Sequence, residues 1–162
     1  MSKVTIWILF LAGLAYGCFC LFLYLRQRSL IYYPHPEVKT SELQSIWLDN
    51  NGQKLKVWKG ATESKTALLY FGGNAEDVLH SHAELERIYP DSSLYLMNYR
   101  GYGGSTGSPS EAALFSDALV LCDRVMTDHD EVIVMGRSLG SAVAVYLAAE
   151  RPVKGMVLVT PY

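Results

Sequence analysis

The longest hydrophobic segment of the chain runs from Val4 to Leu25 and carries no charge. A helix of about 20 such residues can span the hydrocarbon core of a bilayer. A cleavable signal peptide has a shorter core of roughly 7–15 residues and a small-residue exit site, which this run lacks. The pattern therefore predicts an uncleaved, single-pass membrane anchor with its basic flank over residues 1–28.

Charges on either side of this run bear on its orientation. Lys3 precedes the run, whereas Arg26, Arg28 and Lys39 follow it. Cytoplasmic flanks are enriched in Lys and Arg, so the small difference favours a cytoplasmic location for the rest of the chain. Residues 29–43 contain two prolines and predict an extended linker.

The next segments have the periodicity of strands. Residues 44–48 and 54–58 alternate apolar and polar side chains on either side of an Asn-Gly pair. This arrangement predicts an antiparallel hairpin at the edge of a sheet. Continuous apolar runs follow, which are typical of strands buried on both faces. These runs lie at residues 67–71, 93–98, 132–135 and 156–159.

Helical patterns separate the buried strands. Residues 76–88 form one such pattern, and a second opens at a capping box from Ser108 to Glu111 with Pro109 at the first helical position. The expected apolar stripe of the second helix consists of Phe115, Ala118, Leu119, Cys122 and Val125. Strands that alternate with helices predict an α/β fold, with a mostly parallel sheet and helices on both faces, for residues 44–162.

The segment from Glu131 to Glu150 carries the most specific motif. A buried strand runs into a Gly136-x-Ser138-x-Gly140 turn and then into a helix rich in small residues. In a strand–turn–helix of this kind, the serine occupies a strained corner and its hydroxyl stands clear at the end of a sheet. A Cβ at either glycine would collide with the neighbouring helix or strand. Ser138 is therefore a candidate nucleophile, and the helix N-terminus favours developing negative charge.

A second loop has the composition of an oxyanion site. Gly72, Gly73 and Asn74 directly follow the first buried strand, and the two glycines leave the backbone N–H groups accessible to a ligand. Where a nucleophile turn is present, this loop supplies one oxyanion donor, here Gly73 or Asn74. The residue after the serine, Leu139, supplies the other.

Composition argues against several other classes of function. The formal net charge is −2 and no basic stripe is present, which disfavours a nucleic-acid partner. The three cysteines have neither metal-ligand spacing nor the arrangement of a disulfide framework. We therefore expect no metal site.

With these motifs in this order, the chain resembles the α/β-hydrolase superfamily. In particular, it resembles the small membrane-anchored branch related to serine aminopeptidase-type and acyl-protein-thioesterase-type hydrolases. The matching features are the Tyr-Tyr-Pro of the linker, the oxyanion loop, the glycine-dense run 98–105, the Pro-Ser-Glu at 109–111 and the turn 136–140. The resemblance implies that Ser138 attacks a small acyl or peptide-like substrate, an ester, thioester or amide, through an acyl-enzyme without a cofactor.

The sequence also departs from this resemblance. Gly72 stands where the oxyanion loop of the family has a histidine, which implies a looser second donor. The superfamily places an acidic residue and then a histidine after the serine, yet the only carboxylate side chain beyond Ser138 is Glu150, and no histidine follows. The earlier histidines are interpreted as linker, helix-face or surface residues: His35, His80, His82 and His129.

Three functional interpretations therefore remain open. In the first, the chain is the nucleophile half of a membrane-anchored serine hydrolase, C-terminally truncated after its sixth strand, with the acid and base beyond Tyr162. In the second, it is a non-catalytic, degenerate hydrolase-like membrane protein, because a serine without a base is a poor nucleophile. In the third, an upstream histidine, His80 or His82, activates the serine. We expect little or no turnover from the 162 residues alone.

Overall fold

The computed structural model describes residues 2–38 and 43–161. The chain divides into two compact units, residues 1–33 and 34–162, and each is described by itself. Lys39, which contributes to the predicted orientation, and the adjoining linker residues 40–42 lie outside the described residues.

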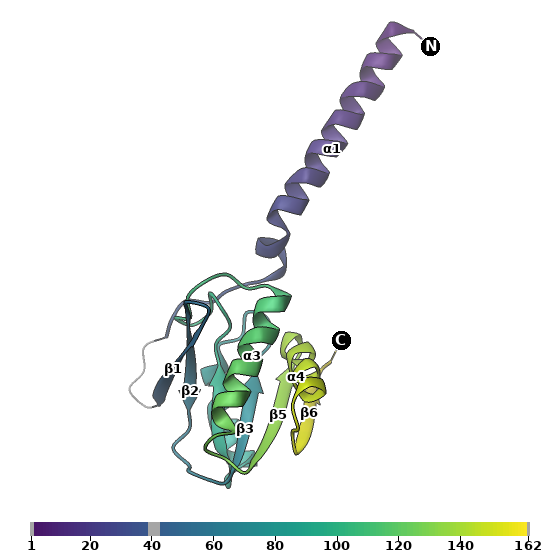
Figure 1. Ribbon diagram of the computed structural model, residues 1–162. Coiled ribbons are helices and arrows are strands. Elements are labelled where there is room, and N and C mark those ends of the chain that lie inside the picture. Colours follow the sequence, from purple (N-terminus) through teal and green to yellow (C-terminus); the bar gives the residue numbers. More distant parts are fainter. Residues whose placement is uncertain (1, 39–42, 162) are drawn as a thin grey trace. The chain divides into compact units, whose positions relative to one another are not determined.

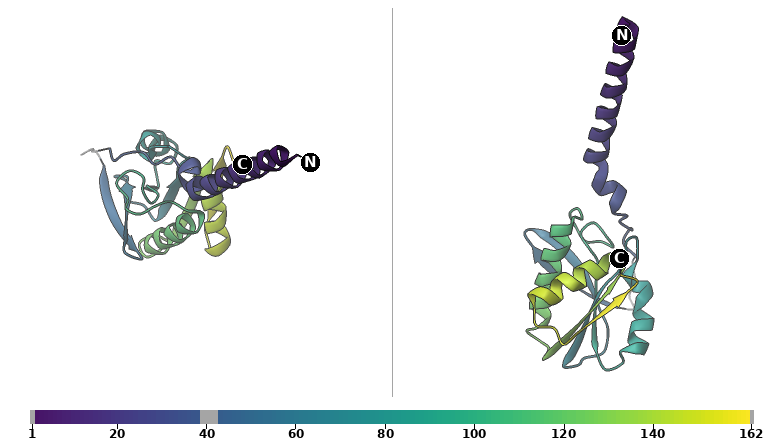
Figure 2. Two further views of the ribbon diagram at one scale, coloured as in Figure 1. Left: turned by 90° about the horizontal axis from the view of Figure 1, so that it is seen from above. Right: turned by 90° about the vertical axis from the view of Figure 1, so that its right-hand side faces the viewer.

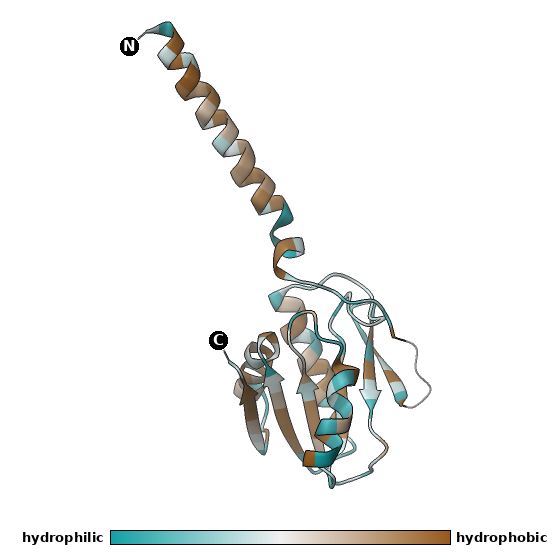
Figure 3. Ribbon diagram, turned by 180° about the vertical axis from the view of Figure 1, so that it is seen from behind, coloured by the Kyte–Doolittle hydropathy of each residue, from teal (hydrophilic) through white to brown (hydrophobic). Residues whose placement is uncertain are grey.

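The first unit is built around one helix, α1 (Lys3–Ile31), in which every described side chain is exposed. Ser2 caps its N-terminus, with the hydroxyl accepting a hydrogen bond from the Thr5 N–H at 3.1 Å. Figure 3 shows hydrophobic residues along most of the helix, with hydrophilic ones near its two ends. By length and composition α1 can cross a membrane, a property that a signal sequence or a soluble core helix can share. The helix continues through the basic flank to Ile31, so residues 29–31 of the expected linker are helical.

The second unit contains a six-stranded sheet with the order β1-β2-β4-β3-β5-β6 (Figure 1). Its strands are β1 (Gln44–Asn50), β2 (Gln53–Lys59), β3 (Thr66–Phe71), β4 (Ser93–Met97), β5 (Glu131–Arg137) and β6 (Gly155–Val159). The first two strands pair antiparallel with each other, β2 pairs antiparallel with β4, and the remaining pairs are parallel. The predicted α/β fold, with a mostly parallel sheet that resembles part of an α/β-hydrolase, is therefore confirmed.

Helices cover both faces of this sheet. On one face lie α3 (Glu111–Val125) and α4 (Leu139–Glu150), and on the other lie the short 3₁₀ helix η1 (Val78–Ser81) and α2 (His82–Ile88) (Figure 2). The central strands β3 and β4 are buried on both sides, as their unbroken apolar runs predict.

The hairpin between β1 and β2 confirms the Asn-Gly signal. Asn51 and Gly52 both have positive φ, 54° and 76°, and together they form the two-residue turn. Two consecutive left-handed residues match the right-handed twist of the strands, which is why Asn-Gly is favoured in such turns.

The two predicted helix starts are wrong in detail. The helix expected over residues 76–88 becomes helical only at Val78, because Asp77 acts as its cap and accepts a hydrogen bond from the Leu79 N–H. In α3 the N-cap is Ser110, whose hydroxyl accepts from the Ala113 N–H at 3.3 Å, so the helix begins after Pro109. A side-chain oxygen that satisfies the first free N–H groups sets these boundaries.

The buried stripe of α3 is rotated from the predicted one. Ala118, Cys122 and Val125 are buried as expected, joined by Leu114, Asp117 and Leu121. Phe115 is only partly buried, and its ring stacks on that of Tyr146 in α4 with centroids 4.2 Å apart. Packing of α3 against a second helix, in addition to the sheet, explains the shift.

Candidate active site

Ser138 lies at the sharp turn between β5 and α4, at the carboxyl end of the sheet. Its backbone has φ 48° and ψ −115°, outside the regions that residues with a Cβ readily adopt. The Ser138 N–H donates to Val159 O at 3.0 Å, and the Ser141 N–H donates to Ser138 O at 2.8 Å. The neighbouring strand and the first turn of the helix thus hold this residue in a strained conformation.

The two glycines of the turn allow this close approach. A Cβ on Gly136 would collide with the carbonyl oxygen of Gly140, and a Cβ on Gly140 would collide with the carbonyl oxygen of Phe71 at the end of β3. Both positions therefore require glycine for steric reasons, as the sequence predicts. The start of α4 packs directly against the β3 strand end.

The turn and the glycine loop after β3 line one pocket of about 370 Å³. Its lining consists of Gly73, Asn74, Ala75, Glu76, Arg137, Ser138 and Thr160. A Cβ built on Gly73 would lie 3.7 Å from Ser138 Cβ, which shows how close the two backbones come. Leu139 is the first residue of α4, so its N–H has no intrahelical partner. Gly73, Asn74 and Ser138 therefore line the same pocket, and Leu139 directly follows Ser138 in the chain.

Glu76 is a polar residue of this pocket that sequence reasoning missed as part of the site. One oxygen of its carboxylate, Oε2, accepts from the Gly73 N–H at 2.6 Å. The other, Oε1, accepts from the Tyr70 hydroxyl at 2.6 Å and from the Ser81 hydroxyl at 2.8 Å. Burial, followed by the hydrogen bond to this carboxylate, raises the pKa of Tyr70 to about 12. Its position three residues after Gly73, in a segment predicted to be helical, concealed this role.

Arg137 extends the same cluster from the other side of the pocket. Its guanidinium lies 3.6 Å from Glu76 Oε2 and is half exposed. The cluster therefore links the strand before Ser138 with the loop after β3.

Two tyrosines from the glycine-dense loop 99–107 hydrogen-bond to the oxyanion loop that lines the pocket. The Tyr99 hydroxyl donates to Gly72 O and the Tyr102 hydroxyl donates to Asn74 Oδ1, each at 2.8 Å. The two rings meet edge to face with centroids 5.7 Å apart. The loop thus contacts the predicted oxyanion segment directly.

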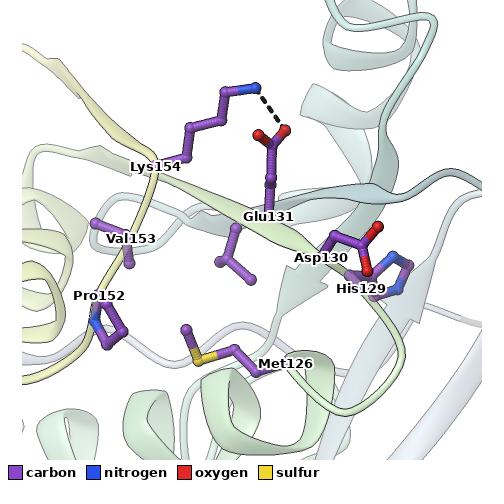
Figure 4. Close-up of a pocket in the computed structure, with 8 residues that line it drawn as sticks. Met126, His129, Asp130, Glu131, Pro152, Val153 and Lys154 are labelled. Atoms are coloured by element: carbon purple, nitrogen blue, oxygen red, sulfur yellow. Dashed lines mark hydrogen bonds and ion pairs between the residues drawn. The ribbon is translucent and has the colours of Figure 1, made fainter.

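The interpretation of His129 as a surface residue is wrong. His129 is buried just before β5, where its Nδ1 donates to Ser64 O at 2.7 Å and its Nε2 accepts from the Tyr95 hydroxyl at 2.9 Å. Figure 4 shows this end of the strand, with a pocket of about 420 Å³ and the Lys154–Glu131 ion pair. His129 therefore lies at the opposite end of β5 from Ser138.

The other histidines also lie away from the serine hydroxyl. His80 is exposed on η1, the His82 imidazole faces Gly60, and His35 Nδ1 is 3.0 Å from Pro36 O. Within residues 2–38 and 43–161, no side chain hydrogen-bonds to the Ser138 hydroxyl and no cluster of ligands could hold a metal ion. The described part of the chain therefore presents a positioned serine without an adjacent base.

Asp117 is a charged residue of α3 that does not face solvent. It is fully buried and accepts two hydrogen bonds from the Arg100 guanidinium, both at 2.7 Å, and one from the Asn50 amide at 2.6 Å. This pairing fixes the beginning of the glycine-dense loop to α3 and to the hairpin.

These features together define part of an α/β-hydrolase fold with a serine at the sharp turn after β5. A sequence profile described as "Serine aminopeptidase, S33" matches residues 62–162. The chain therefore belongs to this family of the α/β-hydrolase superfamily.

Individual relatives agree with this assignment. Protein bem46 of Schizosaccharomyces pombe is 31% identical over 80% of this chain and 50% of its own length. The bovine lysophosphatidylserine lipase ABHD12 is 29% identical over 81% of this chain and 37% of its own length. The Pyrococcus furiosus esterase Pf2001 superimposes with a TM-score of 0.67 at 14% identity, covering 80% of this chain and 56% of its own, and so supports the fold alone. The chain thus spans about half or less of the length of these proteins.

Proposed function

We propose that this chain carries the nucleophile of a serine hydrolase that cleaves an ester, thioester or amide through an acyl-enzyme. The observation that carries the proposal is the backbone of Ser138, a non-glycine residue held at φ 48°. Strain of this kind, of order 1–3 kcal/mol, persists where the surrounding structure enforces it, and it is concentrated at active sites. Family membership supports the same reaction class.

In the proposed reaction, Ser138 Oγ attacks the carbonyl carbon while a base takes its proton, and the carbonyl oxygen becomes an oxyanion. Collapse of this tetrahedral species expels the alcohol, thiol or amine, which takes up a proton. Water then attacks the acyl-serine and releases the acid. The N–H of Leu139 and an N–H from Gly73 or Asn74 would stabilise the oxyanion. The Gly73 N–H also donates to Glu76 Oε2 at 2.6 Å.

Turnover of a p-nitrophenyl ester by the protein expressed from its gene tests this proposal. Ser138→Ala is expected to reduce kcat/KM by at least about a thousandfold, since loss of a nucleophile removes the covalent route. Ser108→Ala, at an exposed serine outside the pocket, serves as the matched control and should leave the rate unchanged. Equal turnover by wild type and Ser138→Ala would contradict the proposal. The name of the bovine relative recommends a lysophospholipid as a second substrate.

A second candidate function is a non-catalytic, hydrolase-like protein. It is favoured by one observation: within the described residues, no histidine hydrogen-bonds to the Ser138 hydroxyl. Under this alternative, the wild type would hydrolyse the ester no faster than Ser138→Ala.

We further propose that α1 anchors the protein in a membrane through Val4 to Leu25. The support is its length and apolar composition, and a 35% identical relative in Saccharomyces cerevisiae is named an uncharacterized membrane protein. Retention in the membrane pellet after alkaline carbonate extraction is expected. Release into the supernatant, with the helix intact by mass, would contradict the anchor.

A further inference from the structure

We propose that Glu76 is a positioning residue that braces the oxyanion loop. Its side chain occupies space that a side chain at position 72 would need. This inference rests on the proposed function for its catalytic consequence, but its structural part stands on the contacts around one carboxylate. The sequence suggests a loop loosened by the loss of a histidine. The structure instead has a carboxylate that reaches back into the loop from four residues further along the chain.

The first observation is the pair of hydrogen bonds that closes the loop on itself. The Gly73 N–H donates to Glu76 Oε2 at 2.6 Å, while the Glu76 N–H donates to Gly73 O at 3.3 Å. Ala75, between them, has φ 61°, a left-handed conformation that a residue with a Cβ adopts only under constraint. Two reciprocal bonds across three residues therefore determine the path of the backbone beside Ser138.

The second observation is that Glu76 itself is fixed from outside the loop. The Tyr70 hydroxyl reaches its Oε1 from β3, and the Ser81 hydroxyl reaches the same oxygen from η1. Only 12% of the Glu76 side chain is exposed. The carboxylate thus connects the loop to β3 and to η1, which restricts the movement of the loop.

The third observation explains why a glycine precedes this loop. A Cβ on Gly72 would lie 2.8 Å from Val78 Cγ1 and 3.3 Å from Glu76 Cδ. The volume that a side chain at position 72 would need is therefore occupied by Glu76 and Val78. Glu76 can therefore reach the loop in this way only if position 72 has no side chain.

The consequence for chemistry follows from what each group can do. The hydrogen bond from the Gly73 N–H to Glu76 holds the backbone of the loop that supplies the second oxyanion donor in the proposed reaction. Because donors in an oxyanion hole must be positioned before the charge develops, loss of the brace should lower kcat more than it raises KM. Glu76 acts through the loop and does not contact the reacting atoms.

Two substitutions distinguish the effect of the length of the Glu76 side chain from the effect of its charge. In Glu76→Gln, the amide oxygen can still accept from the Gly73 N–H while the amide NH₂ donates to the two hydroxyls, since hydroxyls accept as well as donate. In Glu76→Asp, the charge remains, but the side chain is one methylene shorter and cannot hold both ends. We expect kcat within threefold of wild type for Gln, and a kcat at least tenfold lower for Asp with KM changed less than threefold. Glu84→Asp, at an exposed position on α2, is the matched control.

Hydrogen exchange of the Gly73 amide gives a readout independent of catalysis. In ¹⁵N-glycine-labelled chain in detergent micelles, this amide should exchange at least tenfold more slowly in wild type and Gln than in Asp. Equal exchange in all three, or wild-type kcat in Asp, would overturn the brace. Ser138→Ala distinguishes the two proposals: if it retains activity, the proposed function fails, while the exchange rates still decide the role of Glu76.

Discussion

The two ends of β5 carry polar residues in very different states. At the amino end, both ring nitrogens of His129 are hydrogen-bonded, and the Glu131 carboxylate pairs with Lys154 and accepts from the Thr66 hydroxyl (Figure 4). At the carboxyl end, Ser138 has a strained backbone, and its hydroxyl has no described hydrogen-bond partner.

The two ends of β5 therefore contribute to the free energy of folding with opposite signs. A buried histidine with two partners contributes to folding, because its removal leaves a carbonyl and a hydroxyl unsatisfied. A serine at positive φ costs free energy, and backbone strain of this kind is concentrated at active sites. The same strand thus ends in a structural site on one side and a candidate chemical site on the other.

The largest expected effect tests how tightly the carboxyl end is packed. In Gly140→Ala, the new methyl group would collide with the backbone of Phe71, which cannot move without disrupting β3. We expect destabilisation of at least about 3 kcal/mol, the upper range for overpacking, measured by urea denaturation. Gly155→Ala, where nothing lies within 4 Å of the new atom, should change stability by less than about 0.5 kcal/mol. Similar midpoints for both variants would refute the described contact.

The next effect tests the amino end. His129→Ala removes the donor to Ser64 O and the acceptor for Tyr95, both in a buried setting. A loss of about 2–3 kcal/mol is expected, with kcat/KM unchanged in the folded fraction. The control is His80→Ala, at an exposed histidine, which should cost less than about 0.5 kcal/mol. A catalytic defect in His129→Ala would show that the two ends are not separate.

These two ends also differ in how well the sequence predicts them. The turn around Ser138 follows from local chemistry: glycines two residues to either side, a buried strand before and a small-residue helix after. The partners of His129 come from β4 and from the turn before β3, so only the pairing of distant strands reveals them. Sequence reasoning therefore finds the first and misplaces the second.

Glu76 and Asp117 are two further residues whose contacts could not be predicted from the sequence. Each lies in or beside a helical pattern, where a charged residue normally faces solvent. Their burial depends on donors from other elements, Tyr70 and Ser81 for one and Arg100 for the other. No periodicity in the sequence encodes such contacts, because their partners lie on other strands, helices and loops.

A smaller effect with the opposite sign should be seen at the serine itself. Ser138→Gly removes the Cβ that disfavours φ 48°, so the variant is expected to be more stable than wild type by about 1 kcal/mol. Ser108→Gly, in an exposed segment, should instead be neutral or slightly destabilising. Melting temperatures of the two variants give the test, and a less stable Ser138→Gly would mean that the turn is not strained.

The smallest effect concerns titration at the amino end. The hydrogen bond from Lys154, followed by that from Thr66, holds the pKa of Glu131 below its usual value. Because the folded-state pKa is the lower one, this contribution is present above the unfolded pKa near 4.5 and is lost as the pH falls. In Lys154→Ala, the pKa of Glu131 should rise toward 4.5 in a carbon-detected NMR titration. An unchanged pKa would show that the pair does not form in solution.

We propose above that Ser138 is the chemically reactive residue of this fold. The most direct test is to treat the protein expressed from its gene with a fluorophosphonate probe and to map the adduct by mass spectrometry. A single adduct is expected on the peptide that contains Ser138, absent in Ser138→Ala and retained in Ser108→Ala. An adduct on a different serine, or ester turnover without any adduct on Ser138, would contradict it.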